Sequence, residues 1–226
     1  MVGQLVLAPK GRGKAAAGRL YGLSVLRTEV DRAGFWGEYR LDRAGRNLRR
    51  GGVLRVLVPK GFDRWPLLER FGLRPVEADS LVRAQSVPLA LEALERQGLA
   101  PDRATVALRG IRADREMART AAALCAQVRR VVVDAPNGGT ELARWLRREL
   151  GVPILPPGER GQVALEFQPG GARREETLLQ LYGPRPELAG LTLSAPGLAE
   201  EDREDLPLLA ALWEGGKLDR NDIKIT

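Results

Sequence analysis

The alternation of apolar and polar positions is most regular in the middle of the chain. Thr105–Leu108 and Val131–Val133 are short apolar runs, typical of strands that are buried on both faces. Between them, apolar residues recur at helical spacing from Met117 to Val128, after a suitable N-cap at Asp114. These residues predict a strand, a helix and a second strand in succession.

The same alternation continues for one more round. Thr140 is a candidate N-cap for the next helix, and Gly151 suits the residue after its end. Residues 152–155 supply a third short strand. Strands that alternate with helices in this way form parallel sheets through right-handed crossovers. The sequence therefore predicts an α/β fold with a Rossmann-like parallel sheet and flanking helices. The side chains that the second helix should bury are Leu142, Trp145 and Leu146.

The opening section is predicted to be basic and β-rich. Short apolar or alternating runs, interrupted by glycine and arginine, fall at residues 5–8, 21–26 and 38–41. The β-branched run Val53–Val58, followed by a short helical pattern that ends at Gly72, predicts a strand-turn-helix unit. We expect residues 1–80 to form this section and residues 81–226 to form the Rossmann-like core with its C-terminal additions, unless all belong to one domain.

Other segments are predicted from their proline and glycine positions. Residues 81–97 are helical in pattern, and Pro88 should either kink that helix or open a second one. Strand-like residues 163–168 and 177–182 flank Pro169-Gly170-Gly171, which predicts a C-terminal hairpin or an addition to the sheet edge. The acidic run at residues 200–205 suits the N-terminus of a final helix.

Composition removes several classes of chemistry. Because the chain has no histidine, it lacks the usual general base and the usual partner of a nucleophilic serine or cysteine. Its single cysteine, Cys125, can form neither an intramolecular disulfide nor a zinc cluster, and its helical spacing places it with the core residues. Serine-histidine and cysteine-histidine hydrolases are excluded and no residue is assigned to a metal, but whether the chain is an enzyme stays open.

The longest apolar runs, such as residues 206–213, are far shorter than the roughly 20 residues that span a bilayer. The first residues lack the charged and apolar pattern of a secretory signal. We therefore expect a cytoplasmic protein without a membrane partner. The sequence does not indicate an oligomeric state.

Charge is unevenly distributed. Residues 1–74 hold 16 Lys and Arg against 6 Asp and Glu, within a chain whose net charge is +7. Such asymmetry is typical of surfaces that bind nucleic acid or another polyanion. The alternative, which the composition favours, is a chain that uses arginine as its ordinary solvated cation, since only 5 of the 36 basic residues are lysine. The aromatic residues of this section do not favour a base-stacking platform, because they are few: Tyr21, Phe35, Trp36 and Tyr39.

Ligands of doubly wound sheets bind beyond the carboxyl ends of the strands, so the residues that follow each strand are the candidate site. Arg109, Gly110 and Arg112 follow the first core strand, where only one of the three expected glycines is present. Asp134 ends the second strand 24 residues after Gly110, near the spacing of a ribose-binding acid. Over about 60 residues this segment resembles the dinucleotide-binding half of dehydrogenases such as shikimate dehydrogenase. The resemblance implies NAD(P) or another nucleotide, held without the standard glycine fingerprint.

Asn137, Gly138 and Gly139 come between the second strand and the next helix. Free N–H groups and the helix dipole could hold a phosphate or carboxylate there, and Arg109 and Arg112 could add positive charge. The alternative is an ordinary glycine turn, with Asp134 stabilising a neighbouring turn.

Two basic turns share the sequence Pro-Lys-Gly. The first continues from Lys10 as Arg12-Gly13-Lys14, which lacks the glycine and the Ser/Thr of a phosphate-binding loop and is expected to be a flexible basic turn or an anion-binding one. The second contains Lys60 and Asp63, weak candidates for proton transfer if burial lowered the lysine pKa. A helix capped by Asp63 explains the same residues without chemistry.

Two functional hypotheses follow. The first is a small anionic or nucleotide-type ligand at the carboxyl ends of the core strands, with or without catalysis. The alternative is a non-enzymatic nucleic-acid-binding or protein-assembly factor that uses the basic section, where residues 10–55 contain 12 Lys and Arg and 4 Asp and Glu.

Overall fold

The computed structural model describes residues 1–169 and 177–226. The chain forms two compact units, and each is built from two separate stretches of sequence. Unit 1 comprises Met1–Glu77 and Gly197–Asp219, and unit 2 comprises Ala78–Pro196 and Arg220–Thr226. The chain therefore passes between the units three times.

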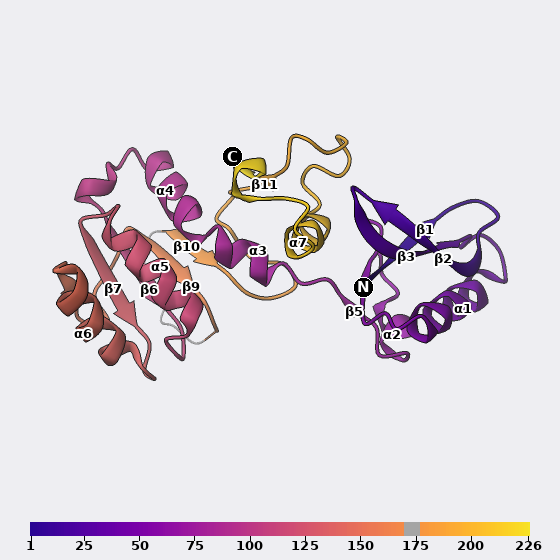
Figure 1. Ribbon diagram of the computed structural model, residues 1–226, viewed down its shortest axis with the longest axis horizontal. Helices are drawn as coiled ribbons and strands as arrows, with labels where there is room; N and C mark the ends of the chain where they lie inside the picture. The colour runs from indigo at the N-terminus through magenta and orange to yellow at the C-terminus, as the bar shows by residue number, and fades with distance from the viewer. Residues whose placement is uncertain (170–176) are drawn as a thin grey trace. The chain divides into compact units, whose positions relative to one another are not determined.

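Unit 1 contains a mixed sheet of five strands in the order β2-β3-β1-β4-β5 (Figure 1). Strands β3, β1, β4 and β5 are parallel, and β2 pairs antiparallel with β3 at the edge. This confirms the β-rich opening section. The strands are β1 (Val2–Leu7), β2 (Arg12–Leu20), β3 (Leu23–Val30), β4 (Arg55–Leu57) and β5 (Arg74–Pro75).

Strands β2 and β3 form a hairpin that the sequence did not indicate. Its two-residue turn is Tyr21-Gly22, with φ of 48° and 78°. Positive φ at both positions gives the backbone twist that suits a tight hairpin. The prediction of a strand over residues 21–26 is therefore wrong at its start. The flexible turn predicted around Arg12 and Lys14 is also wrong, because small and charged residues form an edge strand there.

Helices pack against the sheet of unit 1. Helix α1 (Gly37–Arg50) buries Leu41 and Leu48 in a core that includes Leu5 of β1. A strand over residues 38–41 is therefore wrong: the helical spacing of the buried positions decides the structure. The predicted short helix near residue 65 is present as α2 (Trp65–Glu69). The final helix, α7 (Leu206–Glu214), begins at Asp205, whose carboxylate accepts a hydrogen bond from Leu208 N at 3.1 Å.

Unit 2 contains a fully parallel sheet of five strands in the order β10-β9-β6-β7-β8. Two wings extend from the central β6, with β7 and β8 on one side and β9 and β10 on the other. This is the predicted Rossmann-like arrangement, and the three strands from the central pattern are adjacent and parallel. The strands are β6 (Thr105–Arg109), β7 (Arg130–Asp134), β8 (Ile154–Leu155), β9 (Val163–Glu166) and β10 (Thr177–Gln180).

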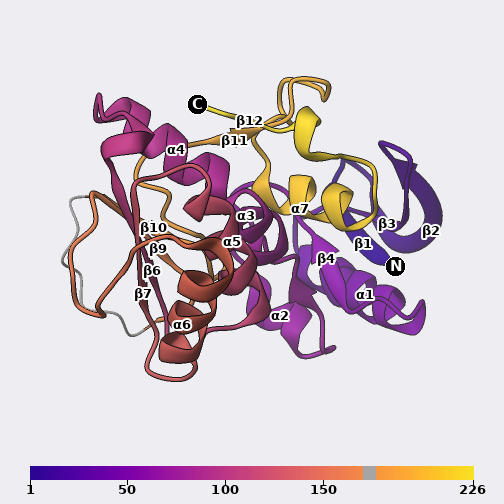
Figure 2. The ribbon, with the colours of Figure 1, turned by 60° about the vertical axis from the view of Figure 1, so that its left-hand side comes forward.

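The crossover helices lie where the pattern predicts them. Figures 1 and 2 show α5 (Arg115–Cys125) and α6 (Gly139–Leu150) side by side on one face of the sheet. Asp114 caps α5 by accepting from Met117 N at 2.9 Å, as expected. Helix α6 instead begins at Gly138, with φ of 81° and no side-chain cap. The Thr140 cap is thus wrong, and Trp145 is 41% exposed rather than buried.

The helix predicted over residues 81–97 is two helices, α3 (Asp79–Ala84) and α4 (Ser86–Arg96), which meet at Gln85. Pro88 lies in the first turn of α4, where its missing N–H leaves no intrahelical bond unmade. Short 3₁₀ helices occur at η1 (Pro101–Arg103) and η2 (Arg220–Asp222).

The C-terminal additions differ from a hairpin. Strands β9 and β10 are parallel, so the hairpin is wrong and the alternative of a sheet-edge addition is correct. The predicted turn residues Gly170 and Gly171 lie outside the described residues. Strands β11 (Leu193–Ser194) and β12 (Lys224–Ile225) form a small antiparallel pair. Within residues 1–169 and 177–226, no helix has both the length and the apolar character needed to cross a membrane.

Candidate functional site

A row of charged residues crosses the strand ends of unit 2. The strand register pairs Arg109 of β6 with Asp134 of β7 on one side and with Glu166 of β9 on the other. Paired residues of neighbouring strands project from the same face of a sheet. The three side chains therefore form a row of acid, arginine and acid at the carboxyl ends of the strands.

Arg109 is 2% exposed and is held by protein atoms. Its Nη1 forms an ion pair with Asp134 Oδ2, and its Nη2 donates a hydrogen bond to the carbonyl of Glu159 at 2.9 Å. A buried guanidinium is stable only when its charge and donors are matched in this way. Arg109 is thus committed to contacts within the protein, and it orients the carboxylate of Asp134.

The loops after β6 and β7 continue the pairing of the sheet. Arg112 and Asn137 form a parallel bridge. The N–H of Ala113 donates to the Asn137 carbonyl at 2.8 Å, and the N–H of Asn137 donates to the Ile111 carbonyl at 3.1 Å. The topology brings these loops together as predicted, and the bonds between them use backbone groups that an anion would otherwise meet.

Close packing or backbone conformation explains the glycines of these loops. A Cβ on Gly110 would lie 3.1 Å from Met117 Cε, and one on Gly139 would lie 3.3 Å from the Cβ of Ala135. Gly138 has φ of 81°, which other L-residues rarely adopt. A ligand at this end of the sheet stays a prediction. The predicted ligand-binding residues that lie together there are Arg109, Gly110, Arg112, Asp134, Asn137, Gly138 and Gly139.

Sequence reasoning missed Glu166. Its side chain is 4% exposed and accepts a hydrogen bond from Tyr182 Oη at 2.9 Å. The available signal was its place at the end of an apolar strand, equivalent to the places of Arg109 and Asp134.

Lys60 and Asp63 are held by different partners. Lys60 is exposed, and its Nζ donates to the Glu201 carbonyl at 2.8 Å. Asp63 pairs with Arg32 at 3.2 Å, and α2 begins at Arg64 without a side-chain cap. The predicted Asp63 cap is wrong, and the structure does not unite the two residues as a proton-transfer pair.

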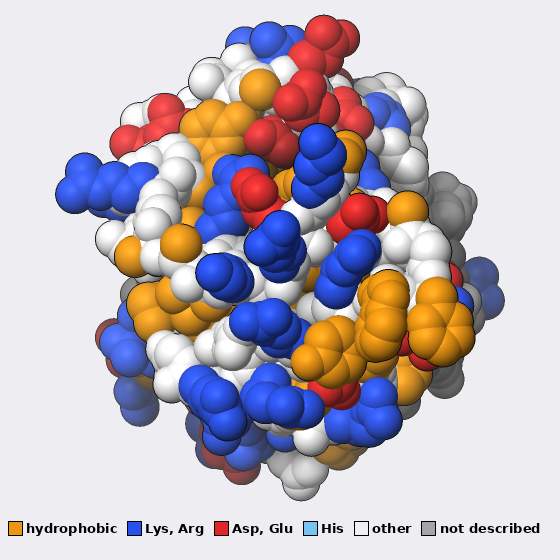
Figure 3. Space-filling model, turned by 90° about the vertical axis from the view of Figure 1, so that its right-hand side faces the viewer, with side chains coloured by type: hydrophobic (Ala, Val, Ile, Leu, Met, Phe, Trp, Pro, Cys, Tyr) orange, Lys and Arg blue, Asp and Glu red, His pale blue; other side chains and the backbone are white. Residues whose placement is uncertain are grey.

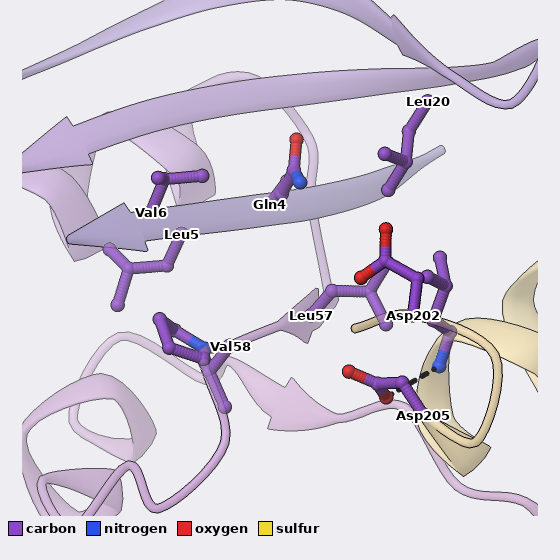
Figure 4. A pocket seen from close by; sticks show the side chains of 10 residues that line it. Gln4, Leu5, Val6, Leu20, Leu57, Val58, Asp202 and Asp205 are labelled. Atoms are coloured by element: carbon purple, nitrogen blue, oxygen red, sulfur yellow. Dashed lines mark hydrogen bonds between the residues drawn. The ribbon is translucent and has the colours of Figure 1, made fainter. Parts of the chain in front are cut away.

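Acidic side chains border a hollow of about 150 Å³ in unit 1, between β1, the end of β4 and the start of α7 (Figure 4). Asp202 accepts a hydrogen bond from Tyr21 Oη at 2.7 Å, and this bond raises the pKa of Tyr21. Burial raises the pKa of Asp205, which also caps α7. Asp202 therefore fastens residues 197–219 to the β2–β3 turn, whereas Asp205 acts within that segment as the cap of α7.

A basic hollow of about 390 Å³ lies over the β2–β3 hairpin. Its floor is made of small residues, and four cations and Glu29 line it. Arg27 pairs with Glu29 at 2.9 Å, whereas the other three cations form no ion pair within the described residues. Figure 3 shows Lys and Arg side chains gathered on the side of unit 1 that carries this hairpin. The cations of the basic hollow are Lys10, Arg12, Lys14 and Arg27.

The backbone beneath the basic hollow is closely packed. A Cβ on Gly11 would lie 2.6 Å from the backbone of Glu29, and one on Gly13 would lie 2.6 Å from the carbonyl of Arg40. Lys10 has φ of 65°, a left-handed conformation that is uncommon for residues other than glycine. The turn thus presents a lysine where backbone geometry alone would favour glycine or asparagine.

An aromatic cluster precedes and begins α1. Phe35, Trp36 and Tyr39 are 91%, 59% and 60% exposed. Phe35 and Trp36 have ring centroids 5.5 Å apart, and Trp36 and Tyr39 have centroids 6.0 Å apart, both with edge-to-face geometry. Tyr39 falls outside the buried positions of α1, so the helix directs its ring toward solvent.

Asp31 connects the basic hollow to the aromatic cluster. Its Oδ1 accepts from Ala33 N at 2.9 Å, and its Oδ2 accepts from Lys10 N at 3.1 Å. These backbone hydrogen bonds, the one from Ala33 first, lower the pKa of Asp31. Arg40 of α1 adds an ion pair at 3.3 Å. One carboxylate thereby fixes the rim of the hollow next to the segment that carries the rings.

The comparisons with known proteins find only weak structural likenesses. No protein-family model matches the sequence, and no curated protein matches it significantly. Six solved chains match, among them L-tryptophan dehydrogenase from Nostoc punctiforme, at 15% identity and a TM-score of 0.29. The likeness covers 73% of this chain and 55% of that one, so the chain spans about half the length of the dehydrogenase.

Proposed function

We propose that this protein binds nucleic acid through the basic hollow and the surrounding face of unit 1. The observation that carries the proposal is a concave surface with three cations, Lys10, Arg12 and Lys14, that form no ion pair within the described residues. Surface cations that form no ion pair are available to phosphates, and their binding releases the counterions of a nucleic acid. By contrast, Arg109 of unit 2 is buried and already paired.

The outer side of α1 carries further positive charge in unit 1. Its exposed arginines form no ion pair in the described part of the chain, apart from Arg46, which pairs with Asp42 at 2.8 Å. Helix α1 packs against the other face of β2 and β3, where Gly13 lies against Arg40 and Ala44, so these charges add to the positive field of unit 1 rather than to the hollow itself. The exposed arginines are Arg43, Arg46, Arg49 and Arg50.

Charge is polarised along the hairpin. Residues 197–219 contain seven acidic and two basic residues, and they are tied to the Tyr21 end by the hydrogen bond from Tyr21 to Asp202. The unpaired cations lie at the other end of β2, whose nine residues span roughly 30 Å. A polyanion is therefore repelled from one end of the hairpin and attracted to the other.

The test is a titration of the full chain against a fluorescent oligonucleotide at several salt concentrations. Binding should weaken linearly on a plot of log affinity against log salt. The variant Lys10→Gln/Arg12→Gln/Lys14→Gln should bind at least about tenfold more weakly and lower that slope by about 2, as expected for three lost phosphate contacts.

The matched control is Arg103→Gln/Arg129→Gln/Arg144→Gln. It removes the same charge from exposed positions of unit 2. Equal losses in the two triple variants would show that net charge alone acts and would remove the proposed surface. Absence of binding by the wild type at low salt would reject the function itself.

A further inference from the structure

We infer that the aromatic cluster stacks the bases of a single-stranded nucleic acid while its phosphates lie at the basic hollow, so that this face selects single strands over duplexes. The inference rests on the proposed function, because it specifies which nucleic acid the face binds. It gives a role to Phe35, Trp36 and Tyr39, which contribute little to the core of unit 1.

The rings of the cluster are unusually exposed. Another aromatic pair of unit 1, Phe62 and Trp65, has the same edge-to-face arrangement, with centroids 5.6 Å apart. That pair packs against the hydrophobic core, and Phe62 is 8% exposed. Phe35, in contrast, is 91% exposed. Rings kept in water next to one another indicate a binding surface rather than a packing role.

The backbone of the cluster is held in place by close packing and by hydrogen bonds. A Cβ on Gly37 would lie 2.4 Å from the Arg32 carbonyl, so the chain passes too closely there for any other residue. The Trp36 carbonyl accepts a hydrogen bond from Arg40 N at 3.0 Å in the first turn of α1. The rings therefore project from an ordered helix start and lose little backbone freedom when they bind a partner.

The segment that carries the cluster is bonded to the rim of the basic hollow. Asp31 bonds to the backbone of both Lys10, at the rim of the hollow, and Ala33, two residues before Phe35. Single-strand binding proteins combine these two features, a positive groove for the backbone and aromatic faces for successive bases. Bases of a duplex are already stacked and paired, so their faces are not available to side chains.

The experiment compares Trp36→Ala with Trp145→Ala in the full chain. Trp145 is the matched control, an exposed tryptophan on α6 of unit 2. The ligands are oligouridylate of about 20 nucleotides, a duplex of equal length and inorganic polyphosphate, which carries charge without bases. Trp36→Ala should weaken oligouridylate binding about tenfold or more and leave polyphosphate binding unchanged. Trp36→Phe should restore most of the affinity.

The possible outcomes distinguish the stacking role from the proposed function. If the wild type shows salt-dependent binding but Trp36→Ala binds oligouridylate as tightly as Trp145→Ala does, the stacking role is overturned and the proposed function stands. If the wild type binds no nucleic acid at low salt, both are rejected. Binding to vesicles that contain phosphatidylserine, lost in Trp36→Ala while oligouridylate is ignored, would overturn both in favour of a membrane surface.

Discussion

The two units place similar residue types after their parallel strands and use them differently. In unit 2, Arg109 is buried between two acids, and the loops after β6 and β7 are bonded to one another. In unit 1, Lys10, Arg12 and Lys14 surround an open hollow and form no ion pair within the described residues. Arginine, lysine and glycine after a strand are therefore not a site by themselves. Such residues are available to a ligand only when their charges are not already paired with acidic groups of the protein.

The largest test of this contrast removes the central charge of the unit 2 row. Arg109→Met leaves Glu166, which is 4% exposed, beside Asp134 without the cation between them. Breaking a buried ion pair on one side costs about 3–5 kcal/mol. The loss should be seen as a lower midpoint in urea unfolding.

Arg12→Met is the matched control for this prediction, because it makes the same chemical change at an exposed residue of unit 1. Its free energy of unfolding should change by no more than about 0.5 kcal/mol. Similar losses in the two variants would contradict the distinction between a structural row and an available surface.

A second prediction concerns the backbone under the basic hollow. Gly13 has φ of 69°, and its Cβ would meet the Arg40 carbonyl at 2.6 Å. Gly13→Ala should therefore destabilise unit 1 by about 2 kcal/mol or more, through strain and a forced shift of α1. Gly61→Ala is the control, since Gly61 has φ of 76° but no atom within 4 Å of the added Cβ. The difference between the two unfolding free energies isolates the close packing of the hairpin on the helix.

The sequence predicted unit 2 better than unit 1 for physical reasons. Strands buried on both faces are continuous apolar runs, so Val131–Val133 and its neighbours were recognisable. Strand β2 was missed because an edge strand of alanine, glycine and arginine buries little apolar surface. Helix α1 was missed because Gly37 and Gly45 interrupt its pattern, although close packing against Arg32 and Phe71 requires both glycines.

The candidate sites show the same limit. That Arg109 and Asp134 lie side by side followed from parallel strand ends, and the register confirms it. Their ion pair depends on side-chain geometry and on the neighbouring Glu166 of β9. Neither can be inferred from the spacing of residues in the sequence. The sequence did not predict the aromatic cluster as a binding surface, because its aromatic residues are few. Only the structure shows that the buried face of α1 points away from them, which leaves the rings exposed.

A third prediction uses Asp205, a partly buried acid of unit 1. Asp205 caps α7, and burial raises its pKa. A raised carboxyl pKa makes the folded state favour the protonated form, so its contribution to stability falls as the pH rises from the unfolded-state pKa, near 4, through the folded-state pKa. Asp205→Asn keeps the capping oxygen without the charge and should be as stable as the wild type at neutral pH, with a weaker pH dependence in that window.

Asp205→Ala is the comparison for this substitution, since it removes the cap and should lose about 1 kcal/mol. Thermal unfolding at several pH values measures both variants. If Asp205→Asn is as unstable as Asp205→Ala, the charge of Asp205 stabilises the fold, and the acid end of unit 1 resembles the row of unit 2 more than its basic hollow.

The smallest expected change in stability concerns Lys10, and it tests the contrast most sharply. Lys10 occupies a left-handed conformation, with φ of 65°, that asparagine adopts more readily than lysine. Lys10→Asn should therefore leave the free energy of unfolding within about 0.5 kcal/mol of the wild type or slightly raise it. The same change should weaken oligonucleotide binding about threefold and reduce the salt slope by about 0.7, because one phosphate contact is lost. A residue retained for structure would show the opposite result, with a loss of stability and unchanged binding. If both quantities stay at their wild-type values, Lys10 takes no part in the proposed surface, and Arg12 and Lys14 must account for the attraction at this end of the hairpin.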